Sequence, residues 1–290
     1  MSLRSNLYAV TKHSAAGVYY RAKSLRNAFA NPKYIFLNCI PKSGTHMING
    51  IVEEVMQNNV SLLEVSDMAF NGMFYDYENH ESKIRSFPNN AYVLSHLTAV
   101  ESNRKLIANY GDRQIFLYRD PRDVAVSYTN WAMKQSRSFM CDILKSQASF
   151  DDALSLVLKG FAPYEVGTNY KAFPGVLKWY RDYQPWLSCP DTFALKFEDI
   201  IGLRGGGDEN LRFKVIKDLC DYLSVDKSAE DIAAKFASDT FNIDPKKSHT
   251  FHKGMGGKIH NWKKYFKDQH FKIFEENGGA QILAAYGYDE

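Results

Sequence analysis

The sequence predicts a single α/β domain in which helices cover both faces of a central parallel sheet. Short, nearly continuous apolar runs, typical of strands buried on both faces, alternate along the chain with segments whose apolar residues recur at helical spacing. No linker rich in proline or glycine divides the 290 residues. A chain of this length can bury roughly three quarters of its unfolded surface without disulfides. We therefore expect one domain over residues 34–290, preceded by a basic arm at residues 1–33.

The first half of the domain predicts two strands and two helices. Residues 34–40 form the first buried strand, and a Pro-Lys-Ser-Gly turn joins it to a helix that begins at Thr45. The apolar residues of that helix recur at helical spacing and are Met47, Ile48, Ile51, Val52 and Val55. Residues 92–94 predict a second short strand, which a helix over residues 99–110 follows.

The second half predicts the rest of the sheet. Residues 114–118 form a third buried strand that leads into a helix over residues 123–133, and residues 192–196 form a fourth strand. Three further helices are predicted at residues 151–159, 171–187 and 209–223. The glycine-rich stretch at residues 204–208 predicts a flexible surface loop.

Composition excludes several classes of protein. Apolar residues make up 45% and charged residues 24% of the chain, which is typical of soluble globular domains, and a net charge of +3 is too small to indicate a nucleic-acid partner. The four cysteines are too far apart for a metal knuckle and too few for a disulfide framework, so we expect reduced thiols, no metal and a cytoplasmic location. No apolar run approaches the ~20 residues that span a bilayer.

The N-terminal arm is strongly basic. No acidic residue precedes Glu53, and Leu3, Leu7 and Val10 fall on one helical face. A terminal helix packed on the domain, or a frayed end, is the interpretation that we favour. The alternative is a weak contact between this arm and an anionic membrane surface or an acidic partner.

The first candidate site is the loop Pro41-Lys42-Ser43-Gly44-Thr45-His46, between a buried strand and a helix. Free N–H groups and the positive end of the helix dipole make such a loop an anion site. Lys42 adds a charge, and Ser43 and Thr45 add hydroxyl donors. An ordinary turn with a helix cap is the alternative, which the lysine makes less favourable. The lysine precedes the glycine, so this is not a Walker A loop, which argues against a nucleoside-triphosphate kinase or a GTPase.

The second candidate site is the string Y-R-D-P-R-D-V-A-V-S-Y at residues 118–128. It lies at the carboxyl end of a strand, where ligands of open α/β sheets bind. Arg119 can present two donors to a phosphate, and Ser127 follows about two helical turns later. Pro121 suits the first helical position, and Asp123 is a candidate cap. Arg122 is either a site residue or a surface charge.

These two motifs, in this order, resemble those of the sulfotransferases that use 3′-phosphoadenosine 5′-phosphosulfate. The resemblance implies a P-loop-like site for the phosphosulfate. The first loop would hold the 5′ end of this co-substrate with Lys42, Ser43, Gly44, Thr45 and His46.

The resemblance also implies the residues that hold the rest of the nucleotide. Arg119 and Ser127 would bind the 3′-phosphate. Residues 251–263 resemble a third motif of the family, which holds the same phosphate, here with His252, Lys253 and Gly254; His252 stands where the family usually has arginine. Tyr180, in a Trp-Tyr segment, and Phe241 would lie near the adenine.

His96 is the candidate catalytic base. It closes the second short strand at the carboxyl edge of the sheet, and a histidine that titrates near neutrality suits proton removal from an acceptor hydroxyl. The resemblance supports it, although the family's Lys-Thr-His triplet here begins with Leu94. His46 is a rival base. Lys42 is placed to stabilise negative charge on the leaving phosphate oxygen, so that no divalent metal is required.

The leading hypothesis is a sulfotransferase that acts on a hydroxyl of a small molecule, a lipid or a carbohydrate. Its second product would be adenosine 3′,5′-bisphosphate. The alternatives are a P-loop-like small-molecule kinase and a non-catalytic relative that only binds the bisphosphate. The acceptor pocket would come from residues 65–81 and 137–170, which mix aromatic residues with a few charges.

Overall fold

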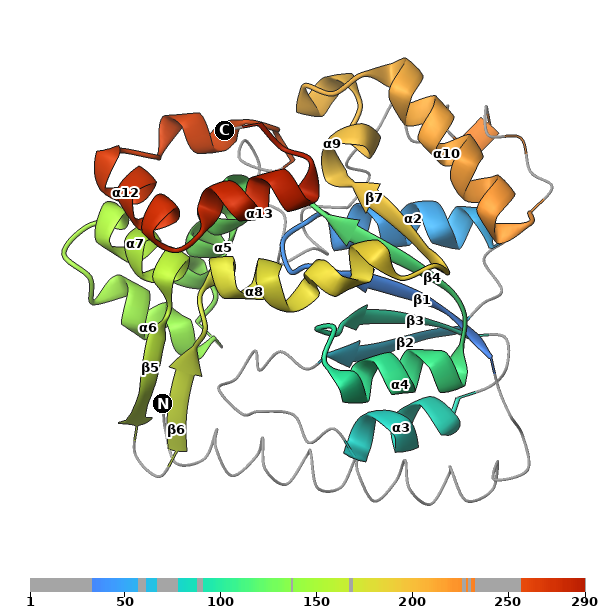
Figure 1. Ribbon diagram of the computed structural model, residues 1–290, viewed down its shortest axis with the longest axis horizontal. Coiled ribbons are helices and arrows are strands. Elements are labelled where there is room, and N and C mark those ends of the chain that lie inside the picture. The colour runs from blue at the N-terminus through green and yellow to red at the C-terminus, as the bar shows by residue number, and fades with distance from the viewer. Residues whose placement is uncertain are drawn as a thin grey trace.

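The computed structural model describes residues 33–56, 61–66, 78–87, 91–136, 138–166, 169–225, 228, 231–232 and 257–289 (Figure 1). The predictions for the N-terminal arm, apart from its last residue, and those for Phe241 and residues 252–254 lie outside these ranges. Among the described residues, no helix is both long and apolar enough to cross a membrane.

A parallel sheet of five strands forms the centre of the fold, as the alternation of strands and helices predicts. Its order is β2-β3-β1-β4-β7. The strands are β1 (Tyr34–Cys39), β2 (Ser61–Ser66), β3 (Ala91–His96), β4 (Gly111–Tyr118) and β7 (Thr192–Lys196). β1 lies between β3 and β4, with Leu37 in register with Leu94 on one side and Ile115 on the other. The carboxyl ends of these three strands therefore meet at one edge.

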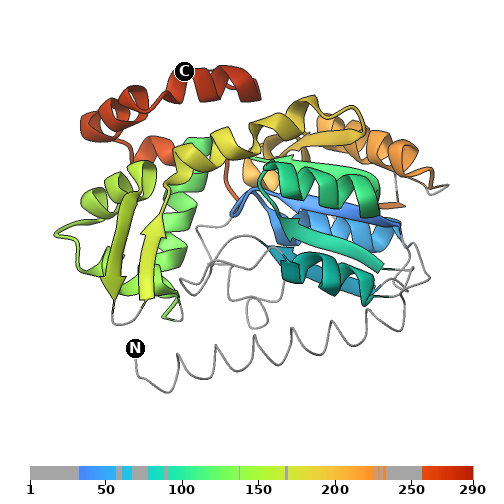
Figure 2. The same cartoon turned by 60° about the horizontal axis from the view of Figure 1, so that its bottom comes forward.

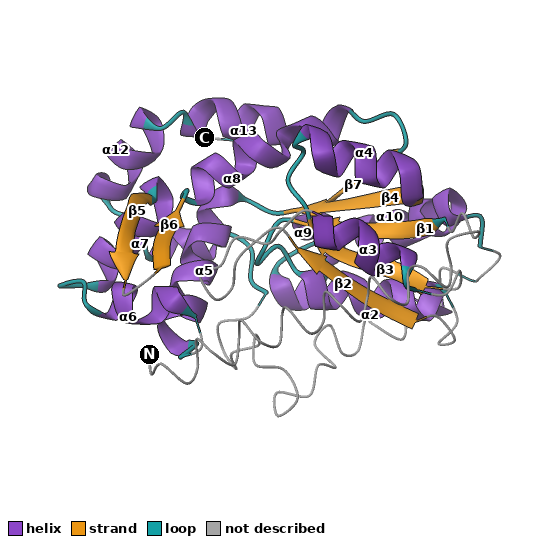
Figure 3. Cartoon of the chain, turned by 90° about the horizontal axis from the view of Figure 1, so that it is seen from below, coloured by secondary structure: helices purple, strands orange, loops and turns teal. Residues whose placement is uncertain are grey.

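Helices cover both faces of the sheet (Figures 1 and 3). Successive side chains of a strand point to opposite faces, so Phe36 packs into one hydrophobic cluster and Leu37 into the other. α2 (Thr45–Val55), α9 (Phe197–Ile200) and α10 (Glu209–Leu223) pack into the Leu37 cluster. The Phe36 cluster contains α4 (Glu101–Tyr110), α5 (Pro121–Lys134), α7 (Phe150–Lys159), α8 (Val176–Tyr183) and α13 (Gly279–Tyr286).

A second, smaller sheet stands apart from the first (Figure 2). It is an antiparallel hairpin of β5 (Phe161–Val166) and β6 (Asn169–Phe173). The prediction of one helix over residues 171–187 is therefore wrong at its start. Pro174 and Gly175, which has a φ of 86°, end the strand and begin α8, and Pro185 then lies in the first turn of the 3₁₀ helix η1 (Gln184–Ser188).

The sequence analysis also missed several elements. These are β2, both strands of the hairpin, α3 (Glu78–Arg85), α6 (Phe139–Lys145), α9, α12 (Asp268–Glu276), α13 and the 3₁₀ helix η3 (Asn261–Lys264). The stretch predicted as a flexible surface loop is partly structured, because a 3₁₀ turn covers Leu203–Gly205 and Gly205 is buried. The carbonyl of Gly205 accepts a hydrogen bond from Ile259 N at 2.9 Å, so this turn holds the segment at Ile259.

The start of α5 differs from the expectation for its cap. Asp120, and not Asp123, is the N-cap, and its side chain accepts a hydrogen bond from the N–H of Arg122 with Pro121 in the first turn. The Asp123 carboxylate is therefore not used as the helix cap. Its Oδ1 accepts a hydrogen bond from Trp262 N at 2.8 Å.

Candidate functional site

Three segments that the sequence singled out converge at the carboxyl edge of the sheet. The loop after β1 carries Lys42, β3 ends at His96, and Arg119 follows β4. Hydrogen bonds to backbone carbonyls hold the segments together: Ile40 N donates to Leu117 O at 3.0 Å, and the His96 side chain contacts Cys39 O through Nδ1 at 2.7 Å. The predicted convergence is confirmed.

The loop after β1 has a strained and closely packed backbone. Gly44 has a φ of 106°, and a Cβ there would lie 2.5 Å from the Phe197 ring, so both conformation and space require glycine. Lys42 also has a positive φ, of 69°. Ser43 is fully buried and its hydroxyl donates to Ile40 O at 2.6 Å. The Ser43 hydroxyl therefore supports the loop, and its contribution to anion binding stays a prediction.

Lys42 is a cation without a carboxylate close by in the described structure. Its Nζ makes a cation–π contact with Trp131, at 5.2 Å from the centre of the ring. Burial, and then the positive charge of Arg119, lower the pKa of Lys42 to about 7. An anion bound at this loop would oppose both effects and raise the pKa of Lys42, since it would supply a negative charge beside the ammonium group.

His96 is held in one tautomer. A backbone carbonyl only accepts hydrogen bonds, so the contact with Cys39 O places the proton on Nδ1 and leaves the lone pair on Nε2. Burial is the main cause that lowers the pKa of His96 to about 4, and positive charge on His46 or Lys42 lowers it further. The ring is therefore neutral at physiological pH, which is the form that a general base needs. The exposed His46, the rival base, lies near enough for a positive charge on it to lower the pKa of His96.

Asn38 fixes the two neighbours of His96, a role that the sequence analysis missed. Its Nδ2 donates to Leu97 O at 2.9 Å, and its Oδ1 accepts from Leu97 N at 2.8 Å and from Ser95 Oγ at 3.1 Å. The side chain is fully buried. A lone asparagine inside an otherwise apolar run is the signal that could have indicated this role, because a buried amide must find partners.

Arg119 is buried and joins the first loop to the C-terminal part of the chain. Its Nη2 donates to Lys258 O at 2.8 Å, its Nη1 lies 3.5 Å from Lys42 O, and its guanidinium stacks 4.4 Å from the centre of the Phe197 ring. Asp123 lies 3.4 Å away as an ion-pair partner, and burial raises the pKa of that carboxyl against the influence of Arg119. Within the described part of the chain, the buried Nε of Arg119 has no hydrogen-bond partner. One donor of this guanidinium is therefore unsatisfied there.

The remaining predicted residues around Arg119 occupy different positions. Ser127 is partly exposed on α5, two turns beyond Arg119. Tyr180 is fully buried, and its hydroxyl donates to the Arg119 carbonyl, so this tyrosine holds the backbone of the arginine. A contact between Tyr180 and adenine stays a prediction. Arg122 is not a surface charge: it is buried, forms a two-point ion pair with Asp120, and stacks 4.1 Å from the Trp262 ring centre.

The third motif reaches this site through its described end. Lys258 O contacts Arg119 and Trp262 N contacts Asp123, although residues 252–254 lie outside the described ranges. Within the described ranges, no group of three or more His, Cys, Asp or Glu side chains could hold a metal ion. The arrangement places one cationic side chain, Lys42 or Arg119, after each of two neighbouring strands.

Comparison with known proteins agrees with this geometry. A family model described as the sulfotransferase domain matches residues 32–279. The fold is similar to the crystal structure of mouse sulfotransferase SULT7A1 complexed with PAP, with a TM-score of 0.58 and 17% sequence identity over 88% of this chain and 86% of that one. A search of curated proteins found no significant match. Because the family model spans most of the chain, this protein belongs to the sulfotransferase domain family.

Proposed function

We propose that this protein transfers a sulfuryl group from 3′-phosphoadenosine 5′-phosphosulfate to a hydroxyl of an acceptor, which is a small molecule, a lipid or a carbohydrate. The observation that carries the proposal is the convergence of Lys42, His96 and Arg119 on one edge of the sheet, with the two cations on separate strand ends. Two separate cations suit a nucleotide with phosphate groups at both its 3′ and 5′ positions. Membership of the family supports the same class of reaction.

Each residue has a distinct task in this reaction. The acceptor oxygen forms a bond to sulfur while the bond from sulfur to the bridging phosphate oxygen breaks. His96 Nε2 takes the acceptor proton, since the ring is neutral at physiological pH and its tautomer carries the lone pair on this nitrogen. The electron pair of the broken bond stays on the leaving phosphate, and the ammonium of Lys42 stabilises that charge. Arg119 binds the 3′-phosphate and takes no part in the bond changes.

Nucleotide binding provides the first test. Adenosine 3′,5′-bisphosphate at 100 times its dissociation constant should stabilise the fold by ~2.7 kcal/mol, and ATP should give a smaller shift in thermal melts. Arg119→Ala should weaken binding of the bisphosphate by about 10-fold or more and binding of adenosine 5′-phosphate much less. A larger shift with ATP would favour the small-molecule kinase and overturn the proposal.

Transfer provides the second test. Labelled phosphosulfate is incubated with a panel of phenols, sterols, lipids and sugars, with and without EDTA. Transfer to a hydroxyl is expected in both conditions, and His96→Ala should lower its rate about 10²–10⁴-fold while nucleotide affinity is kept. Bisphosphate binding without transfer to any acceptor would support the non-catalytic relative. Near-normal transfer by folded His96→Ala would shift the base to His46.

A further inference from the structure

Residues 286–289, which we call the tyrosine clasp, pack onto the segment that carries Arg119. Tyr286 and Tyr288 lie edge-on against Tyr118, with ring centres 5.2 and 6.3 Å away. The carbonyl of Asp289 accepts a hydrogen bond from Arg122 Nη2 at 2.9 Å. The clasp thus contacts residues on both sides of Arg119, although about 170 positions separate the two segments in sequence.

One route from the clasp reaches the backbone next to Arg119 through Glu198. The Tyr288 hydroxyl donates to Glu198 Oε2 at 2.7 Å, and Glu198 Oε1 accepts from the backbone N–H of Asp120 at 3.0 Å. Lys196 holds the clasp from the other side: its Nζ donates to Gly287 O at 2.6 Å and lies 4.7 Å from the centre of the Tyr288 ring. Tyr288 therefore sets the position of a carboxylate that in turn fixes Asp120.

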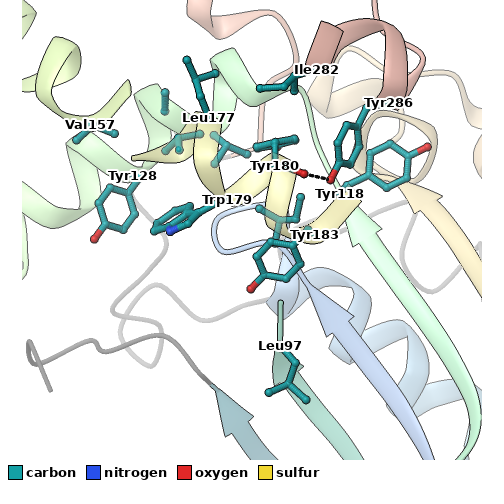
Figure 4. Packing of buried hydrophobic residues seen from close by; sticks show 14 of the residues in the cluster. Leu97, Tyr118, Tyr128, Val157, Leu177, Trp179, Tyr180, Tyr183, Ile282 and Tyr286 are labelled. Atoms are coloured by element: carbon teal, nitrogen blue, oxygen red, sulfur yellow. Dashed lines mark hydrogen bonds between the residues drawn. The ribbon is translucent and has the colours of Figure 1, made fainter. Parts of the chain in front are cut away.

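The second route reaches the carbonyl of Arg119 itself. The Tyr286 hydroxyl donates to Tyr180 O at 2.7 Å (Figure 4). The Tyr180 hydroxyl in turn donates to Arg119 O. Tyr286 and Tyr180 also pack edge-on, with ring centres 4.9 Å apart. Both tyrosines are buried. The two routes thus hold the peptide group that joins Arg119 to Asp120, the first at its N–H and the second at its carbonyl.

We propose that Tyr286 and Tyr288 are positioning residues that set the orientation of the Arg119 guanidinium and thereby the selectivity for a nucleotide with a 3′-phosphate. The proposal rests on the proposed function, because it assigns the 3′-phosphate to Arg119. Neither tyrosine touches the ligand in this account. Each acts through one intermediate residue on the backbone that bears the arginine: Tyr286 through Tyr180, whose carbonyl it contacts, and Tyr288 through the Glu198 carboxylate.

The experiment compares two dissociation constants for each variant, measured by calorimetry. The ligands are adenosine 3′,5′-bisphosphate and adenosine 5′-phosphate. The dissociation constant of adenosine 5′-phosphate divided by that of the bisphosphate is the ratio that isolates the contribution of the 3′-phosphate. Tyr288→Phe and Tyr286→Phe remove only the hydroxyls and should lower the ratio about 3- to 10-fold, a part of the ~10-fold or larger loss expected when Arg119 itself is removed. Glu198→Gln keeps an acceptor for Asp120 N and should retain the ratio, whereas Glu198→Leu should lower it.

Tyr222→Phe is the matched control. Its hydroxyl accepts from Gln114 N at 3.0 Å and donates to Asp191 O at 2.7 Å, so it also braces β4, but at the end away from the site. It should lower the melting temperature and leave the ratio unchanged. If both clasp variants behave like Tyr222→Phe, the inference is wrong and the proposed function stands. If the wild-type protein binds both nucleotides equally, the proposed function fails and the inference fails with it.

Discussion

Replacing His96 by asparagine should remove a specific part of the pH dependence of folding stability. The pKa of His96 is lowered from 6.5 to about 4 in the fold, so the unfolded chain takes up the proton first as the pH falls. The histidine therefore costs no stability above about pH 6.5 and destabilises the fold progressively between about pH 6.5 and pH 4. At about pH 5 the difference is about 2 kcal/mol, an upper figure because part of the ring is exposed to solvent.

Urea unfolding of the wild type and of His96→Asn at several pH values from about 5 to 8 measures this difference. Asparagine can keep a donor towards the Cys39 carbonyl but does not titrate. The free-energy difference between the two proteins should therefore change by about 2 kcal/mol in favour of the variant as the pH falls. Buried Asp123 and Glu198, whose raised pKa values act with the opposite sign, are present in both proteins and cancel. A constant difference across this range would refute the burial of a neutral imidazole.

Three further changes test the site. The Lys42 pKa of about 7 should rise when an anion binds, so bisphosphate binding should take up a proton near neutral pH and weaken as the pH rises. Calorimetry in buffers of different ionisation enthalpy measures this proton uptake, which should be lost in Lys42→Met. Asn38→Leu leaves the backbone N–H and C=O of Leu97 without the Asn38 side chain and should lower the free energy of unfolding in urea by about 2–4 kcal/mol. A loss below about 0.5 kcal/mol would contradict the role of Asn38 in holding Leu97. Gly205→Ala places a Cβ against Ile201 and 2.6 Å from a backbone carbonyl, so thermal melts should record a loss of about 1–3 kcal/mol, whereas an unchanged melt would mean that the turn relaxes freely.

The parts of the fold that follow local rules could be predicted from the sequence. β1, β3, β4 and β7 read as strands because each contains a short apolar run, and the parallel order of β3, β1 and β4 brings Lys42, His96 and Arg119 together. β2 mixes serines and a glutamate into its apolar residues and lies at the sheet edge, so its pattern is weak. The sequence predicts one helix over the end of β6, α8 and η1, because its helical spacing outweighs the Pro174-Gly175 break.

The partners of the site arginines could not be predicted. Lys258 O and Asp289 O are backbone carbonyls, which every residue has, so no residue type indicates that they bind Arg119 and Arg122. Similarly, the position of Tyr180 behind Arg119 depends on how α8 packs against β4, and helical periodicity alone indicates only that it is buried. Tertiary packing decides these contacts.

The distance along the chain between Arg119 and its partners has a consequence for the order of folding. Arg119 and Arg122 bind carbonyls 139 and 167 residues further on. The loop after β1 and the strands beside it need only residues up to Tyr118, so they can associate early in synthesis. Burying a guanidinium before its partners arrive is costly, and contacts of such long sequence separation form slowly. The part of the site around Arg119 is therefore completed late, and a chain still being synthesised exposes both arginines to solvent.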